Sequence, residues 1–210
     1  MRDNGNIILA IESAICGGSI SLLADGVEMA NWVGSSNVSK AEDLLFNIDA
    51  MLTSTNVSRH DIDLIAVSAG PGSFTGIRIG LATALGLTDG LGIKMSSGSA
   101  LKAMVWGRDD GHVTAALPVG RNSICLQSFQ IANGEVTETD EPRTLPDDDF
   151  FEFVREHPET SFVLHESLYE KCSPTPRSDN FGTNIARVIG LMCATQPGIV
   201  AEPLFISKSV

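Results

Sequence analysis

The sequence has few of the residues that make zinc sites and disulfide frameworks. Its four cysteines are scattered and form no Cys-x-x-Cys pair; they are Cys16, Cys125, Cys172 and Cys193. This spacing argues against a zinc knuckle and a disulfide-stapled scaffold, and it indicates reduced, mostly buried thiols. The four histidines include no pair four residues apart. A two-histidine metal site on one helix is therefore not expected.

Basic residues and long apolar runs are also scarce. There are 14 Lys and Arg against 26 Asp and Glu, a net charge of −12. Such a surface repels phosphate backbones, so we expect no direct binding of nucleic acid by the chain alone. No apolar run reaches the roughly 20 residues that span a bilayer, and residues 1–6 have no signal-peptide pattern. We expect a cytoplasmic protein that makes no membrane contact.

The first half of the chain alternates strand-like and helix-like segments. The pattern predicts strands at residues 6–12, 19–24, 27–33, 62–69 and 93–96. It predicts helices at residues 40–53, from the glycine-rich turn to about 91, and at 99–106. The dipeptide Asp25-Gly26 marks a hairpin turn. A meander followed by strand–helix–strand order predicts an α/β fold with a mixed sheet.

The second half is predicted to be a smaller and less regular lobe. The segment G-R-D-D-G at residues 107–111 marks the expected boundary, which gives domains at 1–106 and 107–210. Strands are expected at residues 113–117, 123–131, 136–139, 162–165 and 203–207. Helices are expected from Pro146 and at residues 184–194, because proline and the following carboxylates suit a helix start.

A glycine-rich turn, G-P-G-S-F-T-G at residues 70–76, connects a strand to a helix. Phosphate-binding loops occupy this position in other folds. The turn is no P-loop, since no Gly-Lys-Ser/Thr follows, and its second and third glycines are one residue too far apart for a dinucleotide fingerprint. The simplest interpretation is that these glycines let strand and helix approach closely.

Small residues recur every four positions along the helix that follows this turn. They are Gly76, Gly80, Ala84 and Thr88. Each interior glycine costs roughly 1 kcal/mol of helix stability relative to alanine, so a close contact must compensate. That contact lies either inside this fold or across an interface with another chain.

Three stretches of this sequence together resemble the TsaB (YeaZ) family. They are I-I-L-A-I-E-S near the start, the helix with paired leucines, and D-L-I-A-V-S-A-G-P-G-S-F-T-G-I-R-I-G-L-A. The match runs from Ile7 to about Met104, and residues 70–80 are nearly diagnostic. In the second half the resemblance extends only to the general layout.

The resemblance implies an actin-like ATPase (ASKHA, RNase H-like) fold of two lobes, each with a mixed sheet flanked by helices. It implies a non-catalytic scaffold that binds TsaD, the enzyme that makes threonylcarbamoyladenosine (t6A) at A37 of tRNAs reading ANN codons. The implied partners are TsaD in a heterodimer, the ATPase TsaE in a larger complex, and a second copy through the same surface when alone. No cofactor is expected on the chain itself, and a nucleotide at the TsaD interface is left open.

The docking surface expected from this resemblance combines the two N-terminal helices. Its residues are Leu44, Leu45, Ile48, Met51, Gly76, Gly80, Leu81, Ala84 and Leu85. The candidates for a nucleotide or phosphate contact are Glu12, Ser13 and Arg78, because an acidic residue and a small-residue turn at this place serve phosphate in actin-like ATPases. No catalytic residue and no metal ligand are expected.

The chain departs from related sequences at two places. TsaD-like enzymes carry an HxxxH metal motif where this chain reads Lys-Ala-Glu-Asp-Leu at residues 40–44, and many TsaB sequences keep a histidine near Lys40. An Asp-Ala-Arg run of the second lobe is replaced by Pro-Val-Gly-Arg at 118–121. The rival hypothesis is a stand-alone M22-type peptidase or ATP-dependent enzyme, and Glu12 with its turn is its best support.

Overall fold

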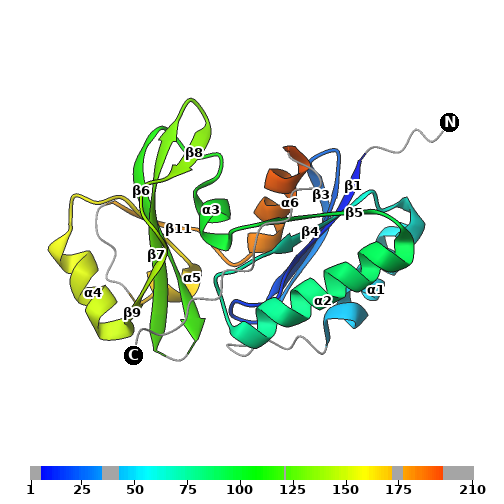
Figure 1. Ribbon diagram of the computed structural model, residues 1–210, viewed down its shortest axis with the longest axis horizontal. Helices are drawn as coiled ribbons and strands as arrows, with labels where there is room; N and C mark the ends of the chain where they lie inside the picture. The colour runs from blue at the N-terminus through cyan, green and yellow to red at the C-terminus, as the bar shows by residue number, and fades with distance from the viewer. Residues whose placement is uncertain (1–5, 35–42, 121, 172–176, 196–210) are drawn as a thin grey trace. The chain divides into compact units, whose positions relative to one another are not determined.

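The computed structural model describes residues 6–34, 43–120, 122–171 and 177–195. Among these, residues up to Ala100 and from Asn184 onward form one compact unit, and Leu101 to Thr183 form a second. Each unit holds one mixed sheet with helices packed on it (Figure 1), as predicted. The division differs from the one expected at residue 107, because the last helix packs on the first sheet.

The first sheet has five strands in the order β3-β2-β1-β4-β5. They are β1 (Ile7–Glu12), β2 (Ser19–Ala24), β3 (Val27–Val33), β4 (Leu64–Ser68) and β5 (Lys94–Gly98). The first three form an antiparallel meander, and β4 and β5 continue the sheet parallel to β1. The predicted hairpin turn is confirmed, since Asp25 and Gly26 have φ of 49° and 76°.

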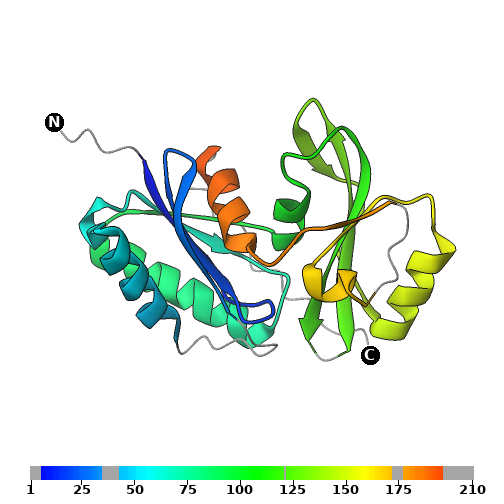
Figure 2. The same ribbon diagram turned by 180° about the vertical axis from the view of Figure 1, so that it is seen from behind.

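Three helices cover the two faces of the first sheet (Figures 1 and 2). Helices α1 (Leu44–Thr55) and α2 (Phe74–Leu91) pack on one face, and α6 (Ile185–Thr195) packs on the other. Strand β1 is therefore buried on both faces: Leu9 and Ile11 join the core with α1, and Ala10 faces Gly190 of α6. Burial on both faces explains the unbroken apolar run in β1.

Polar contacts attach the start of α6 to the first meander. The Glu28 carboxylate accepts hydrogen bonds from Ser21 Oγ (2.5 Å) and from Asn184 Nδ2 (2.9 Å). The Ser19 hydroxyl oxygen accepts the backbone N–H of Ala186 at 3.0 Å. This last pair is 167 positions apart in sequence, which is why no local pattern predicted that α6 returns to the first sheet.

The second sheet has the order β11-β10-β6-β7-β8, with β9 also paired to β7. Its strands are β6 (Gly111–Gly120), β7 (Ser123–Ala132), β8 (Glu135–Glu138), β9 (Arg143–Pro146), β10 (Phe162–Leu164) and β11 (Ser178–Asn180). Strands β6, β10 and β11 are parallel, and β6 and β7 form a long antiparallel pair. Helix α4 (Asp147–Glu156) contributes Phe150 and Val154 to the core of this unit.

Helix α3 (Ala100–Val105) lies within one residue of the helix predicted at 99–106, and the boundary between the units falls at its start rather than after its end. The prediction missed four short elements: η2 (Arg59–Asp61), α5 (Glu166–Tyr169), β9 and β11. Elements of three or four residues are too short to show a hydrophobic period. The strand predicted at 203–207 lies outside the described residues. Within the described ranges, no helix combines the length and the apolar character needed to cross a bilayer.

Candidate functional site

The turn between β1 and β2 is a tight loop of small residues with unusual backbone angles. Cys16, Gly17 and Gly18 have φ of 38°, 93° and 80°. The Gly18 N–H donates to the Ile15 carbonyl at 2.7 Å, which closes the loop. Successive N–H groups in such turns make an anion-binding concavity, so the turn has the form expected of a phosphate cradle.

Glu12 fills this cradle with its own side chain. Its carboxyl Oε1 accepts the backbone N–H groups of Ala14 (2.5 Å) and Ile15 (3.1 Å), and the residue is 2% exposed. Burial raises the pKa of the Glu12 carboxyl to about 8, although the two backbone hydrogen bonds act in the opposite direction. The backbone N–H groups of Ala14 and Ile15 are therefore used within the chain. The Glu12 carboxyl faces protein rather than an open site.

Helix α2 packs its first turns directly on this loop. Ser13 Oγ donates to the Gly76 carbonyl at 2.8 Å, and the Ser73 N–H donates to the Ala14 carbonyl at 2.9 Å. A Cβ on Gly76 would lie 2.4 Å from the Ser13 carbonyl oxygen, and a Cβ on Gly80 would lie 2.4 Å from Ser13 Oγ. The glycines of α2 thus allow helix and loop to approach closely.

This packing decides between the two interpretations of the small-residue stripe. Gly76, Gly80 and Ala84 are buried inside the first unit, with Ala84 at 0% exposure. Their assignment to a docking surface must be corrected: the compensating contact is internal. A Gly80→Leu substitution would place its side chain against Ser13 and damage the fold.

The core-facing residues of α1 need the same correction. Leu44, Ile48 and Met51 are 3–6% exposed, because they pack against the first sheet. Their spacing of three and four positions correctly predicted one apolar face of a helix, and that face lies in the core. Residues 40–42, which include Lys40, lie outside the described residues.

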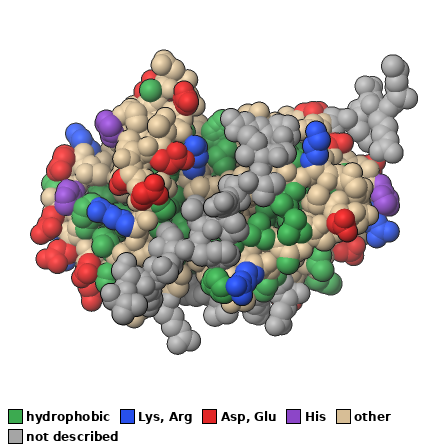
Figure 3. All heavy atoms as spheres, in the orientation of Figure 1, with side chains coloured by type: hydrophobic (Ala, Val, Ile, Leu, Met, Phe, Trp, Pro, Cys, Tyr) green, Lys and Arg blue, Asp and Glu red, His purple; other side chains and the backbone are tan. Residues whose placement is uncertain are grey.

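The outer surface of α1 and α2 carries a second, exposed set of apolar side chains. It comprises Leu45 (58% exposed), Phe46 (74%), Phe74 (51%) and Leu85 (55%); we call these four the apolar face. Leu81 is partly buried against the core. Figure 3 shows hydrophobic side chains gathered over the part of the first unit where α2 runs. Leu45 and Leu85 were predicted for docking, whereas Phe46 and Phe74 were not.

A sequence signal for Phe46 did exist. It is a large apolar residue two positions after Leu44, out of phase with the Leu44–Ile48–Met51 stripe that faces the core. A helix that packs only against its own core needs no aromatic residue on its outer side.

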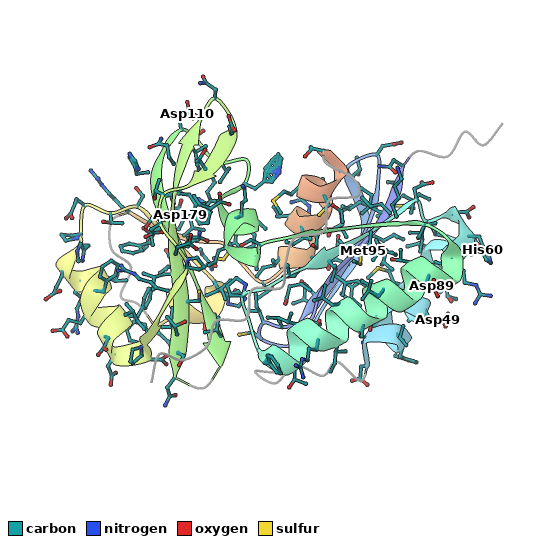
Figure 4. The ribbon with its side chains drawn as sticks, viewed as in Figure 1. Asp49, His60, Asp89, Met95, Asp110 and Asp179 are labelled. Atoms are coloured by element: carbon teal, nitrogen blue, oxygen red, sulfur yellow. The ribbon has the colours of Figure 1, made fainter. Side chains whose placement is uncertain are left out.

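Acidic residues also occur on these two helices, among them Asp49 on α1 and Asp89 on α2 (Figure 4).

Arg78 is exposed and belongs to the same surface. Its guanidinium carbon lies 3.8 Å from the centroid of the Phe74 ring, a cation–π contact within one turn of α2. Glu12 and Ser13 are buried beneath α2, whereas Arg78 points outward. The structure therefore does not bring the three nucleotide candidates into one site.

No cluster of three or more His, Cys, Asp or Glu side chains suited to a metal ion occurs in the described parts of the chain. His165 is 2% exposed at the end of β10, where its Nδ1 is 3.0 Å from Ser167 Oγ. Burial lowers the pKa of His165 to about 4, so the imidazole is neutral at physiological pH.

Comparisons with known proteins agree with this architecture. The family model of TsaD, tRNA N6-adenosine threonylcarbamoyltransferase, matches residues 38–138. The TsaB biosynthesis protein of Escherichia coli is 34% identical over 140 residues, which cover 62% of this chain and 60% of that protein. The Bacillus subtilis TsaB is 26% identical over 167 residues, which cover 78% of this chain and 73% of that protein.

Two solved structures share the fold over nearly the whole chain. YeaZ from Pseudomonas aeruginosa has a TM-score of 0.67 at 18% identity, covering 91% of this chain and 93% of that one. A protein described as similar to peptidase YeaZ of the same organism has a TM-score of 0.70 at 19% identity, covering 96% and 100%. The two mixed sheets with their helices thus form the fold of these YeaZ structures. The chain is similar to TsaB (YeaZ) proteins, in sequence over part of its length and in fold over nearly all of it.

Proposed function

We propose that this chain is a non-catalytic subunit that binds a TsaD-type enzyme and supports threonylcarbamoyl transfer to A37 of tRNAs that read ANN codons. The observation that carries the proposal is the apolar face: four large side chains of α1 and α2, each more than half exposed. The similarity to proteins named for tRNA threonylcarbamoyladenosine biosynthesis supports a role for this chain in the t6A pathway.

The composition of the apolar face suits a protein partner. Two aromatic and two leucine side chains, buried together, release several kcal/mol at roughly 25 cal/mol per Å² before the entropic cost of association. Arg78, stacked on Phe74, adds a charge that is already held in place. Aromatic and arginine side chains are enriched among the residues that dominate binding energy at interfaces.

The buried glycine stripe contributes to this surface indirectly. Because Gly76 and Gly80 let α2 sit tightly on the β1–β2 turn, they hold Phe74 and Leu85 on a rigid helix. A rigid surface loses less entropy on binding. The glycine motif that marks the family would then support the docking helix from behind.

The sequence and the site both support a role without chemistry of its own. The HxxxH motif of TsaD-like enzymes is absent at residues 40–44. Glu12, the best candidate for a metal or phosphate role, is buried and bound to its own turn. The chemistry would therefore reside on the partner.

The decisive experiment is size-exclusion chromatography with light scattering, using this protein and TsaD from the same organism. We expect a heterodimer peak that is lost in the double variant Phe46→Asp/Leu85→Asp. Val27→Asp is the matched control, because Val27 is 69% exposed on β3, in the same unit but off the two helices. A complex that survives the double variant, or that Val27→Asp also breaks, would reject this surface.

Three further parts of the proposal concern the assembly. TsaE joins the TsaD-bound complex, the isolated chain pairs with a second copy through the apolar face, and any nucleotide sits at the TsaD interface rather than on this chain alone. The double variant should therefore be monomeric by itself. The whole assembly is proposed to act in the cytoplasm.

The rival hypothesis, a stand-alone peptidase or ATP-dependent enzyme, makes a different prediction. It requires ATP hydrolysis or peptide cleavage by the purified chain that is lost in Glu12→Ala. Since the Glu12 carboxyl is enclosed, we expect neither activity above the background of the Glu12→Ala variant. Turnover by the wild-type chain alone would replace the scaffold proposal with an enzymatic one.

A further inference from the structure

The second unit contains an open pocket of about 550 Å³ that the docking proposal does not use. Its lining includes the start of β6, Ser128 of β7, the segment before β10 and Arg177 before β11. It therefore lies at the amino-terminal end of the parallel strands. Ligands of open α/β sheets bind at the opposite, carboxyl end, so the position is unusual for this class of fold.

The lining of the pocket includes a pair of hydroxyl groups. Thr114 and Ser128 are cross-strand partners on β6 and β7, and their hydroxyl oxygens are 3.1 Å apart. Thr114 is only 5% exposed. The next pair on this face, Ala116 and Leu126, belongs to the apolar core of the unit. The face of the sheet thus changes from apolar to hydroxyl-bearing at the pocket.

Arg177 is fixed at the rim by main-chain contacts. Its Nη1 donates to the Glu159 carbonyl oxygen at 2.6 Å, and its own carbonyl accepts the Phe162 N–H at 3.0 Å. A guanidinium has five N–H donors in a planar fork, so further donors remain for a ligand. The nearby carboxylate of Asp179, marked in Figure 4, is paired with Arg108 at 2.7 Å.

We propose that this pocket binds a small oxyanion, a phosphate or carboxylate group, between the Arg177 guanidinium and the hydroxyl pair of Thr114 and Ser128. Arginine forks match both groups in geometry. The Glu159 main chain positions Arg177, whereas the exposed Glu159 side-chain carboxylate repels the same ligand. The Arg177 side chain therefore raises the affinity for the oxyanion, and the Glu159 side chain lowers it.

The test is a titration of ¹⁵N-labelled protein, followed by amide chemical shifts. The probes are sodium phosphate and sodium acetate, with sodium chloride at equal ionic strength as reference. We expect saturable shifts at the amides of Thr114, Ser128 and Ser161 with one or both oxyanions. The tighter of the two probes identifies the preferred group.

Matched variants separate binding from a structural effect. Arg177→Gln should weaken the affinity by about tenfold or more, since a charged hydrogen-bond partner is lost. Glu159→Gln keeps the main-chain carbonyl that holds Arg177 and should strengthen binding about twofold. Arg155→Gln, on the exposed surface of α4, should change nothing. Non-saturable shifts, shifts equal to those in chloride, or an unchanged affinity in Arg177→Gln would overturn the proposal.

Discussion

The two units use glycine for different purposes. In the first unit, Cβ atoms on Gly76 and Gly80 would collide with the β1–β2 turn at 2.4 Å. In the second, Gly107, Gly134 and Gly182 have φ of 74–84° and no atom within 4 Å of a Cβ position. Glycine thus permits close packing as well as turns in the first unit, whereas these glycines of the second unit serve turns.

This difference explains why the first unit is easier to recognise from sequence. A close approach constrains the helix, the loop and the residues between them, so the glycines occur in a dense motif at 70–80. An open turn tolerates other residues, as Asn133 shows with φ of 54°. The second unit has no comparable motif, and its resemblance was limited to layout.

Among the described Asp, Glu and His residues, each unit buries one side chain, and the two make stability depend on pH in opposite directions. Glu12 lies in the first unit and His165 in the second, both 2% exposed. Burial favours the neutral form of each, which raises the pKa of the acid and lowers that of the base. The units should therefore lose stability at opposite ends of the pH range.

The largest expected effect concerns Glu12. Its pKa is about 8 in the fold against 4.5 as the ordinary value, so the folded state holds a proton that the unfolded chain releases. Stability should fall as pH rises from 4.5 to 8, by an amount on the order of 5 kcal/mol. Hydrogen exchange of β1 and β4 amides at several pH values measures this, corrected for intrinsic exchange. Glu12→Gln should remove the dependence; an unaltered pH profile in that variant would contradict the assignment.

His165 should produce the opposite trend in the second unit. Its folded pKa of about 4 lies below the ordinary 6.5, so the unfolded chain takes up a proton first. Stability should fall as pH drops from 6.5 to 4, by about 3 kcal/mol. Exchange of β6 and β7 amides reports it, and His165→Asn, which can still accept a hydrogen bond at the start of α5, should flatten the curve. If β1 and β4 responded equally, the units would not be independent.

Gly76→Ala tests the close packing of the first unit. The added methyl group meets backbone atoms of Ser13 and Ala14 at 2.4 and 2.6 Å, neither of which can rotate away. We expect a loss of about 2 kcal/mol in urea denaturation, and weaker binding in the proposed TsaD complex because α2 shifts. A variant with unchanged stability would show that the β1–β2 turn moves to accommodate the added methyl group at little cost.

Gly86→Ala is the matched control and the smallest effect. Gly86 lies on the same helix, with no atom within 4 Å of its Cβ position. Alanine should therefore raise helix stability by about 0.5–1 kcal/mol in the same urea assay. A loss of stability would mean that this side of α2 is covered, against the exposure of Leu85 beside it.

Much of the fold could be read from the sequence, but the side of each helix that forms the surface could not. The run in β1, the Asp25-Gly26 turn and the α1 stripe predicted their elements correctly. The same patterns assigned Ile48 and Ala84 to an interface, although both are buried. Periodicity shows that a helix has an apolar face, whereas neighbours far away in sequence determine what covers it.

The sequence by itself determined the class of fold, the local elements and the relationship to TsaB, because these depend on local backbone preferences and a contiguous motif. Tertiary structure alone decided that Glu12 occupies its own turn, that the glycine stripe packs inward and that α6 returns to the first sheet. Those features depend on contacts between segments up to 167 positions apart, whose geometry no local pattern contains. Phe46 and Phe74 could be assigned to the surface only after the structure showed which residues of each helix pack in the core.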